Sequence, residues 1–178
     1  KSCLTNYVST FNINTELVEK APLRGPMYVS EIDKKDKFFR FNSNYVSVKE
    51  FDKPLLSKGW SGCFSFSKSN IIVDAPYDPK TPFLFFGEEM DIFARLYTRG
   101  WEMYVPSQPI CFTIFDRSYR KTFWEHPDCK KIVNFSRMRL YNRFKYIDVQ
   151  EELQTKDHRL KLGNEKSLKE FFKYVNLE

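Results

Sequence analysis

The spacing of apolar and polar positions predicts a chain that mixes short strands with helices. Aromatic-rich runs bounded by turn residues are typical of strands. Such runs occur at residues 2–11, 63–66, 101–107 and 110–115, and residues 37–51 ("KFFRFNSNYVSVKEF") favour two strands around Asn42, Ser43 and Asn44. Residues 12–27 are punctuated by Pro22, Gly25 and Pro26, and we expect no regular element there.

The clearest helical spacing lies between residues 88 and 99, where Ile92, Phe93, Leu96 and Tyr97 recur on one face. Gly100 is suited to end that helix. Residues 83–86, directly before it, are short, apolar and aromatic, and they predict a strand or an extended entry to the helix. Further helices are expected at residues 70–73, capped by Ser67 or Ser69, in "RKTFWEH" and "IVNFSRMRLYNRF", and in residues 167–177, where Ser167 and Glu170 form a capping-box pattern.

The order of these elements bears on the fold class. Strands and helices do not alternate in a regular β-α-β order, which favours an α+β domain or an incomplete piece of an α/β domain. We expect residues 1–178 to form a single domain or domain fragment, with a basic helical C-terminal region from about residue 117 to residue 178.

The composition is that of a globular chain, with 42% hydrophobic and 29% charged residues among 178. The net charge is +6 and the isoelectric point about 9.0. A basic balance suits nucleic acid, an anionic membrane surface or a phosphate-bearing ligand, and it equally suits a plain solvated surface. Charge alone therefore defines no site.

The four cysteines, Cys3, Cys63, Cys111 and Cys129, form no C-x-x-C pair, so a zinc or redox framework is unsupported. Reduced thiols favour a cytoplasmic protein. No run approaches the roughly 18 apolar residues of a membrane helix, and we expect no membrane partner.

Two adjacent acids, Glu88 and Glu89, follow Gly87 at the predicted start of the helix. Acids in a first turn stabilise a helix by about 0.3–1 kcal/mol each through its dipole, which accounts comfortably for one of them. A pair of carboxylates behind a glycine could also accept hydrogen bonds from sugar hydroxyls, stabilise positive charge at a sugar carbon, or help to hold a metal. Both interpretations stay open on chemistry alone.

Three stretches carry a family resemblance: "GWSGCFSFSKSNI", "DPKTPFLFFGEEMDIFARLYTRGWEMYVPS" and "ICFTIFDRSYRKTFWE". They resemble the second half of the GT-A fold in the polypeptide N-acetylglucosaminyltransferases that act on hydroxyproline, glycosyltransferase family 60. The mucin-type polypeptide GalNAc-transferases show a more distant version of the same block. The start "CLTNY" and the end "KLGNEKSLKEFFKYVNL" extend the similarity over the whole chain. The resemblance implies the C-terminal, acceptor-side part of a GT-A glycosyltransferase.

The resemblance also implies site residues. Glu88 and Glu89, with Gly87, match the acidic motif at the sugar site, where they would be the catalytic groups. Arg95 and Trp101 match the helix arginine and the turn after it, and Trp60, Ser61 and Gly62 match the loop that faces donor and acceptor. Trp60 could stack on a sugar or anchor a loop, and Arg95 could bind substrate or pair with Glu89 or another acid.

Two departures concern the metal. Enzymes of this kind hold Mn²⁺ or Mg²⁺ and the UDP-sugar through an acidic motif that is expected just before residue 1, together with the nucleotide-binding half. The family also has a histidine that helps to ligate the metal, and Thr113 stands at that position here. His126 and His158 are displaced from it. The sequence therefore supplies no metal ligands.

Three accounts of these departures remain open. The donor half could come from a missing N-terminal half or a partner chain. The enzyme could be metal-independent, with Arg117, Arg120 or Lys121 neutralising the donor diphosphate. The chain could also be a relic that binds a partner without catalysis. A fold with one half missing would expose a sheet edge, so self-association into a homo-oligomer is expected.

The leading hypothesis is transfer of a sugar, GlcNAc by resemblance, from a UDP-sugar to a hydroxyl of a protein acceptor. The alternative is a non-catalytic binding module. It would use a basic, aromatic face between Arg117 and Tyr146 to bind nucleic acid or an acidic protein. The same segment equally suits two amphipathic helices with basic outer faces.

Overall fold

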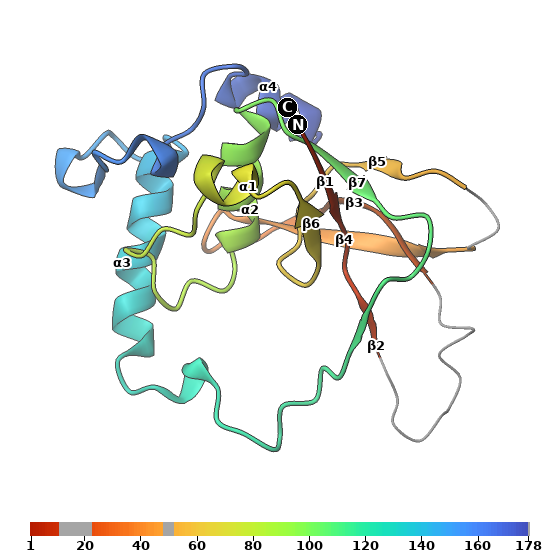
Figure 1. Ribbon diagram of the computed structural model, residues 1–178. Helices are drawn as coiled ribbons and strands as arrows, with labels where there is room; N and C mark the ends of the chain where they lie inside the picture. The colour runs from red at the N-terminus through yellow and green to blue at the C-terminus, as the bar shows by residue number, and fades with distance from the viewer. Residues whose placement is uncertain (11–22, 48–51, 178) are drawn as a thin grey trace.

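The computed structural model describes residues 1–10, 23–47 and 52–177 (Figure 1). Its largest sheet has four strands in the order β5-β7-β1-β6, with bounds Leu55–Ser57, Glu102–Val105, Ser2–Thr5 and Ser65–Ser67. The central strand β1 runs parallel to β7 and antiparallel to β6, and β5 is antiparallel to β7. A short parallel pair joins β2, Ser9–Thr10, to β8, Phe112–Thr113. The mixture of helices with parallel and antiparallel strands agrees with the expected α+β fragment.

A long antiparallel hairpin, β3 (Leu23–Ile32) and β4 (Phe39–Val46), was only half anticipated. The predicted turn at residues 42–44 is wrong, because Asn42 and Ser43 pair with Tyr28 and Met27 within one continuous strand. The partner strand β3 begins within residues 12–27, where no regular element was expected, so that expectation is wrong for residues 23–27. Residues 12–22 lie outside the described residues. Strand β3 accommodates its Gly-Pro pair at a register shift between Arg24 and Met27, where a proline removes no ladder hydrogen bond.

Four helices occur in the described residues: α1 (Asn70–Asp74), α2 (Glu88–Tyr97), α3 (Cys129–Arg143) and α4 (Leu168–Tyr174). The capping box of α4 is confirmed, since the Ser167 hydroxyl accepts from Glu170 N and the Glu170 carboxylate accepts from Ser167 N. Helix α1 is confirmed, but Ser69 makes no capping hydrogen bond with its side chain. The helix expected in "RKTFWEH" is reduced to one 3-10 turn, Phe123–Glu125, and two more such turns lie at Glu151–Leu153 and His158–Leu160.

The predicted strand at residues 83–86 is also wrong. These residues form a loop in which Phe83 has φ 57° and the rings of Phe85 and Phe86 are exposed. The left-handed backbone at Phe83 is incompatible with a strand, and Pro82, directly before it, has no N–H to extend the pairing toward the N-terminus. The glutamates that follow therefore emerge from an aromatic loop, not from a buried strand.

Helix α2 lies in the middle of the molecule, with α3 on one side, α4 at one end and the strands on the other side (Figure 1). Every residue from Met90 to Tyr97 is buried. Its Phe93 ring packs against Phe41 of β4 at 5.7 Å and against Phe171 of α4 at 5.4 Å. Trp101 N donates to Leu96 O at 3.1 Å and Gly100 takes φ 74°, so the helix ends where the sequence predicted. This packing fixes the first turn of α2, which carries both glutamates.

Candidate active site

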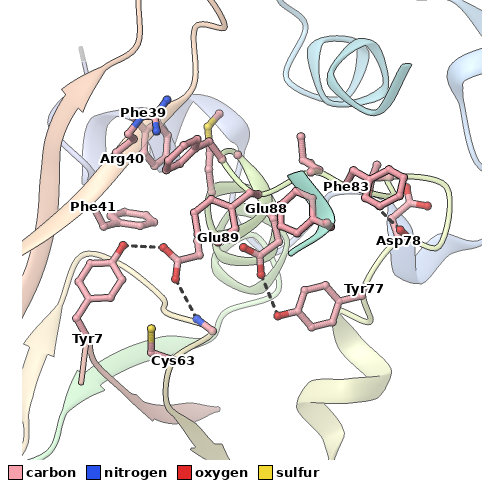
Figure 2. Close-up of a pocket in the computed structure, with 18 of the residues that line it drawn as sticks. Tyr7, Phe39, Arg40, Phe41, Cys63, Tyr77, Asp78, Phe83, Glu88 and Glu89 are labelled. Atoms are coloured by element: carbon pink, nitrogen blue, oxygen red, sulfur yellow. Dashed lines mark hydrogen bonds between the residues drawn. The ribbon is translucent and has the colours of Figure 1, made fainter. Parts of the chain in front are cut away.

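A pocket of about 1010 Å³ opens beside the first turn of α2 (Figure 2). Its walls come from the β3–β4 hairpin, the glycine loop around Gly62, the segment of residues 77–87 and a stretch near Arg117. Small-molecule sites commonly enclose about 300–1,000 Å³, so this one is at the upper end. Glu88 and Glu89 both line it.

Gly87 sets the position of the two glutamates. It caps α2 in the left-handed region with φ 99°, and a Cβ there would lie 2.6 Å from Cδ2 of Phe38. A residue other than glycine would therefore meet both backbone strain and the buried Phe38 ring. The resemblance assigned Gly87 to the site. In the structure Gly87 lets α2 begin in close contact with Phe38, beside the pocket wall.

Glu89 is held by two donors from distant segments. Tyr7 Oη donates to Glu89 Oε2 at 2.6 Å, and Gly62 N donates to Glu89 Oε1 at 3.0 Å (Figure 2). Burial raises the pKa of Glu89, and the hydrogen bonds from Tyr7 and Gly62 oppose that rise. Both carboxylate oxygens are thus engaged, which fixes the orientation of the group.

Glu88 has a different environment. Tyr77 Oη donates to Glu88 Oε1 at 2.9 Å (Figure 2). The pKa of Glu88 is raised to about 7: burial and the charges of Glu89 and Asp91 raise it, and the hydrogen bonds from Tyr77 and from the Glu89 backbone lower it. The pKa values of Tyr7 and Tyr77 are raised, by burial and by their glutamate partners, so both stay protonated donors. Glu88 can therefore exchange a proton near neutral pH.

The glycine loop reaches the pocket through Gly62 and Cys63. A Cβ on Gly62 would lie 3.4 Å from Tyr77 Oη and 3.5 Å from Glu88 Oε1, so the bare backbone forms part of the floor. Ser61 is buried and exchanges hydrogen bonds with Thr5. Trp60 is buried as well, donates from Nε1 to Ser65 Oγ at 3.1 Å and does not line the pocket. Of the two open interpretations of Trp60, these contacts favour the loop anchor.

Arg95 and Trp101 are not brought to the pocket. The Arg95 side chain has no exposed surface, and its guanidinium donates to Asp91 and to the carbonyl of Pro76. Trp101 is buried in the core and donates from Nε1 to Asp74 Oδ2 at 2.8 Å. Arg95 thus pairs with an acid, as one alternative held, but the acid is Asp91 and not Glu89.

A buried ion network surrounds Arg95. Asp91 pairs with Arg95 and Arg143, and Asp78 pairs with Arg139 at 2.8 Å and with Arg143 at 2.7 Å. The network joins the loop that carries Tyr77 to α2 and α3. The expected basic outer face between Arg117 and Tyr146 is wrong at Arg139 and Arg143, because these two side chains point inward to meet the aspartates.

Arg117 lies on the pocket wall, as a group that binds a donor diphosphate would.

Sequence reasoning missed Tyr7 and Tyr77, the two hydroxyls that hold the glutamates. Nothing in the local sequence marks either tyrosine. Tyr7 is 82 residues from Glu89, so only the folded chain brings them together.

The residues expected near a metal do not gather. No group of three or more His, Cys, Asp or Glu side chains that could hold a metal ion occurs in residues 1–10, 23–47 and 52–177. Thr113 lies in β8. His126 packs against the Phe83 ring at 5.2 Å and accepts at Nδ1 from Asp128 N, and His158 lies in a 3-10 turn. This donor set does not fit Mn²⁺ or Mg²⁺, and we derive no metal-dependent step.

A large pocket with two carboxylates and a cation on its wall has the features of a site that binds a polar small molecule. Residues 1–178, the whole chain, match the family described as Glycosyltransferase (GlcNAc). The chain therefore belongs to this family of glycosyltransferases, whose activity requires a nucleotide-sugar donor and an acceptor. No curated protein and no solved structure matches the chain significantly. In the described part of the chain, none of the helices has the length and hydropathy needed to cross a membrane.

Proposed function

We propose that this protein transfers N-acetylglucosamine from a UDP-sugar to a hydroxyl group of a protein, in the pocket beside Glu88 and Glu89. The observation that carries the proposal is the pair of adjacent carboxylates in the pocket, each held by a tyrosine hydroxyl. The family match supports the sugar named in its description. We propose the UDP-sugar, the protein acceptor and the GT-A fold from the resemblance, and the cytoplasmic location from the reduced thiols.

The proposed reaction divides the work between the two glutamates. The bond between the anomeric carbon and the diphosphate oxygen breaks, and its electron pair leaves with UDP. The acceptor oxygen bonds to the anomeric carbon and its proton passes to Glu88, whose pKa of about 7 suits a general base. Glu89, with both oxygens fixed, faces the positive charge that develops at the sugar.

Arg117 completes the proposed site. It lines the pocket, and its positive charge would neutralise the diphosphate as the bond to the sugar breaks. Gly62 provides a floor on which a sugar ring can approach both glutamates without meeting a side chain. Trp60, Ser61, Arg95 and Trp101 are no substrate contacts in this proposal, because they are buried and do not line the pocket, although the Ser61 hydroxyl helps to hold Glu89.

The test measures release of UDP from UDP-GlcNAc, with and without Mn²⁺, for the wild-type chain and for Glu88→Gln and Glu89→Gln. Loss of a general base or of a charge-stabilising group is expected to lower turnover by about 10²-fold or more. Glu152→Gln, at an exposed glutamate far from the pocket, is the matched control and should retain full turnover. The proposal would be contradicted if Glu88→Gln and Glu89→Gln both retained the turnover of wild type. It would also be contradicted if the wild-type chain neither bound nor turned over UDP-GlcNAc.

A further inference from the structure

Five aromatic side chains form one rim of the pocket and continue beyond it. We call them the aromatic ledge: Phe83, Phe85, Phe86, Phe123 and Trp124. The four phenylalanines line the pocket, and Trp124 extends the surface outward. The ring centroids of Phe83 and Phe123 are 5.8 Å apart in a stacked arrangement, and those of Phe123 and Trp124 are 4.1 Å apart. Phe85 meets Trp124 edge-on, with centroids 5.5 Å apart. Each ring is therefore fixed by another ring of the ledge.

The ledge is exposed although it is apolar. Phe85 is 42% exposed, Phe86 41% and Trp124 48%. Contiguous exposed apolar surface beside a pocket marks a binding surface, whereas single exposed rings do not. Because the rings already hold one another, the ledge side chains lose little conformational freedom when a partner binds. The five side chains offer no polar atom except the Trp124 indole N–H, which suits an apolar side chain better than a second sugar.

The ledge is continuous with the proposed catalytic groups. Phe86 is two residues before Glu88, so their Cα atoms lie within about 8 Å of each other. An extended peptide advances about 3.3–3.6 Å per residue, so a peptide that presents a hydroxyl to Glu88 places its next few residues over the ledge. The pocket, at about 1010 Å³, also has room for more than one sugar ring.

The charges around the ledge favour an acidic partner. Arg117, Arg120 and Lys121 belong to the segment that leads into Phe123. The two acids in the same stretch are occupied locally: Asp116 accepts from Ser118, and Glu125 accepts from Thr122. Arg117 lines the same pocket as the ledge, and the Arg40 guanidinium lies 3.4 Å from the centre of the Phe86 ring, so cations lie beside the apolar rings.

We infer that the aromatic ledge docks an extended segment of the acceptor polypeptide. That segment carries an apolar side chain within about three residues of the hydroxyl that receives the sugar, and an acidic residue next to it. This inference rests on the proposed function and names the substrate class of the same site.

The test uses the tryptophans as reporters. Trp60 and Trp101 are only 6% and 2% exposed, so Trp124 is the one that a docked peptide can desolvate. The probe is a synthetic peptide with a central serine, a leucine two residues before it and a glutamate beside the leucine. A second peptide has serine in place of the leucine. We expect a saturable blue shift of the fluorescence, with about tenfold weaker binding of the peptide that lacks leucine.

Two variants sharpen the test. Phe85→Ser should weaken binding of the leucine peptide about tenfold. Phe66→Ser is the control, because Phe66 is 67% exposed on β6 and does not line the pocket, and it should bind as wild type does. Equal affinity for the two peptides, or wild-type affinity of Phe85→Ser, overturns the inference. A blue shift that grows with protein concentration in the absence of peptide, or one produced by anionic vesicles and not by peptide, overturns it in favour of a second copy or a membrane.

Failure of the inference and failure of the proposed function can be told apart. Transfer of GlcNAc to both peptides with equal KM would leave the proposed function standing and remove the ledge as an acceptor site. Leucine-dependent binding without any sugar transfer to the peptide or to water would leave the ledge as a peptide-binding surface and contradict the proposed function.

Discussion

The first turn of α2 holds carboxylates in two opposite environments. Glu88 and Glu89 face the pocket, and their partners are uncharged donors: the hydroxyls of Tyr7, Tyr77 and Ser61 and backbone N–H groups. Asp91, two residues after Glu89, turns to the interior, is 4% exposed and pairs with Arg95 and Arg143. Acids that are neighbours in the sequence thus differ in whether a positive charge compensates their burial.

The pKa values record this difference. Burial alone would raise the pKa of Asp78, the second aspartate of the network, but hydrogen bonds from Arg139, Lys80 N and Arg143 bring it below its usual range. Burial raises the pKa of Glu88 to about 7, and the neutral Tyr77 hydroxyl only partly opposes that rise. A guanidinium compensates desolvation, whereas a hydroxyl does so only in part. Asp78 therefore stays charged near neutral pH, while Glu88 can take up a proton there.

The two environments are also connected. Tyr77, which holds Glu88, is followed directly by Asp78, which is anchored to α3 by Arg139 and Arg143. The network contains three arginines and two aspartates, so one positive charge remains in excess. We infer that the network positions the loop of Tyr77 against α2, and with it the carboxylate of Glu88.

The largest expected effect comes from breaking the network at Asp78. Asp78→Ala leaves Arg139 and Arg143 buried without their shared carboxylate, which should lower the free energy of unfolding by about 3–5 kcal/mol. Urea unfolding at pH 7 measures it. The cost should shrink as pH falls through the lowered pKa of Asp78, because the wild-type carboxylate is then protonated too. Glu165→Ala, at the exposed pair with Lys1, is the control and should change stability little. Equal effects of the two variants would refute the role of the network.

A smaller effect of opposite sign is expected at Glu88. Its pKa rises from 4.5 to about 7 on folding, so the folded state binds the proton more tightly. Its contribution to stability is complete below pH 4.5 and is lost as pH rises through 7. Glu88→Gln should therefore match wild type at pH 4 and exceed it at pH 8 by up to about 3 kcal/mol. Denaturant unfolding at the two pH values checks this. If the variant is less stable than wild type at pH 8, burial of the ionised Glu88 carboxylate does not destabilise the fold.

Local patterns predicted the parts of the fold that local forces determine. The spacing of apolar residues and the flanking Gly87 and Gly100 located α2, because helix periodicity and left-handed glycine caps act within a few residues. The capping box of Ser167 and Glu170 was found for the same reason. The prediction of a strand at residues 83–86 failed because an aromatic-rich composition is typical of strands and also of this loop. In the loop the ring of Phe85 packs on those of Phe86 and Phe123.

The contacts that define the site lie beyond such patterns. Arg139 and Arg143 look like surface cations in sequence, and their burial depends on Asp78, which is 61 and 65 residues away. The glutamate pair could be named from its motif, but its partners Tyr7 and Tyr77 could not. A pKa near 7 at Glu88 follows from burial and from neighbours, and neither is encoded in a motif.

The smallest expected effect isolates the hydrogen bond between Tyr77 and Glu88. Tyr77→Phe removes the donor that favours the ionised carboxylate, so the pKa of Glu88 should rise above 7. If Glu88 accepts the acceptor proton, the acidic limb of the pH–rate profile moves to higher pH. The rate should fall less than about tenfold at pH 7 and hardly change at pH 9. Tyr7→Phe is the matched control, because Tyr7 holds Glu89 and should leave that limb in place. A limb that moves equally in both variants would assign the titration to the pair of glutamates as a unit, and a limb that moves in neither would remove Glu88 as the base.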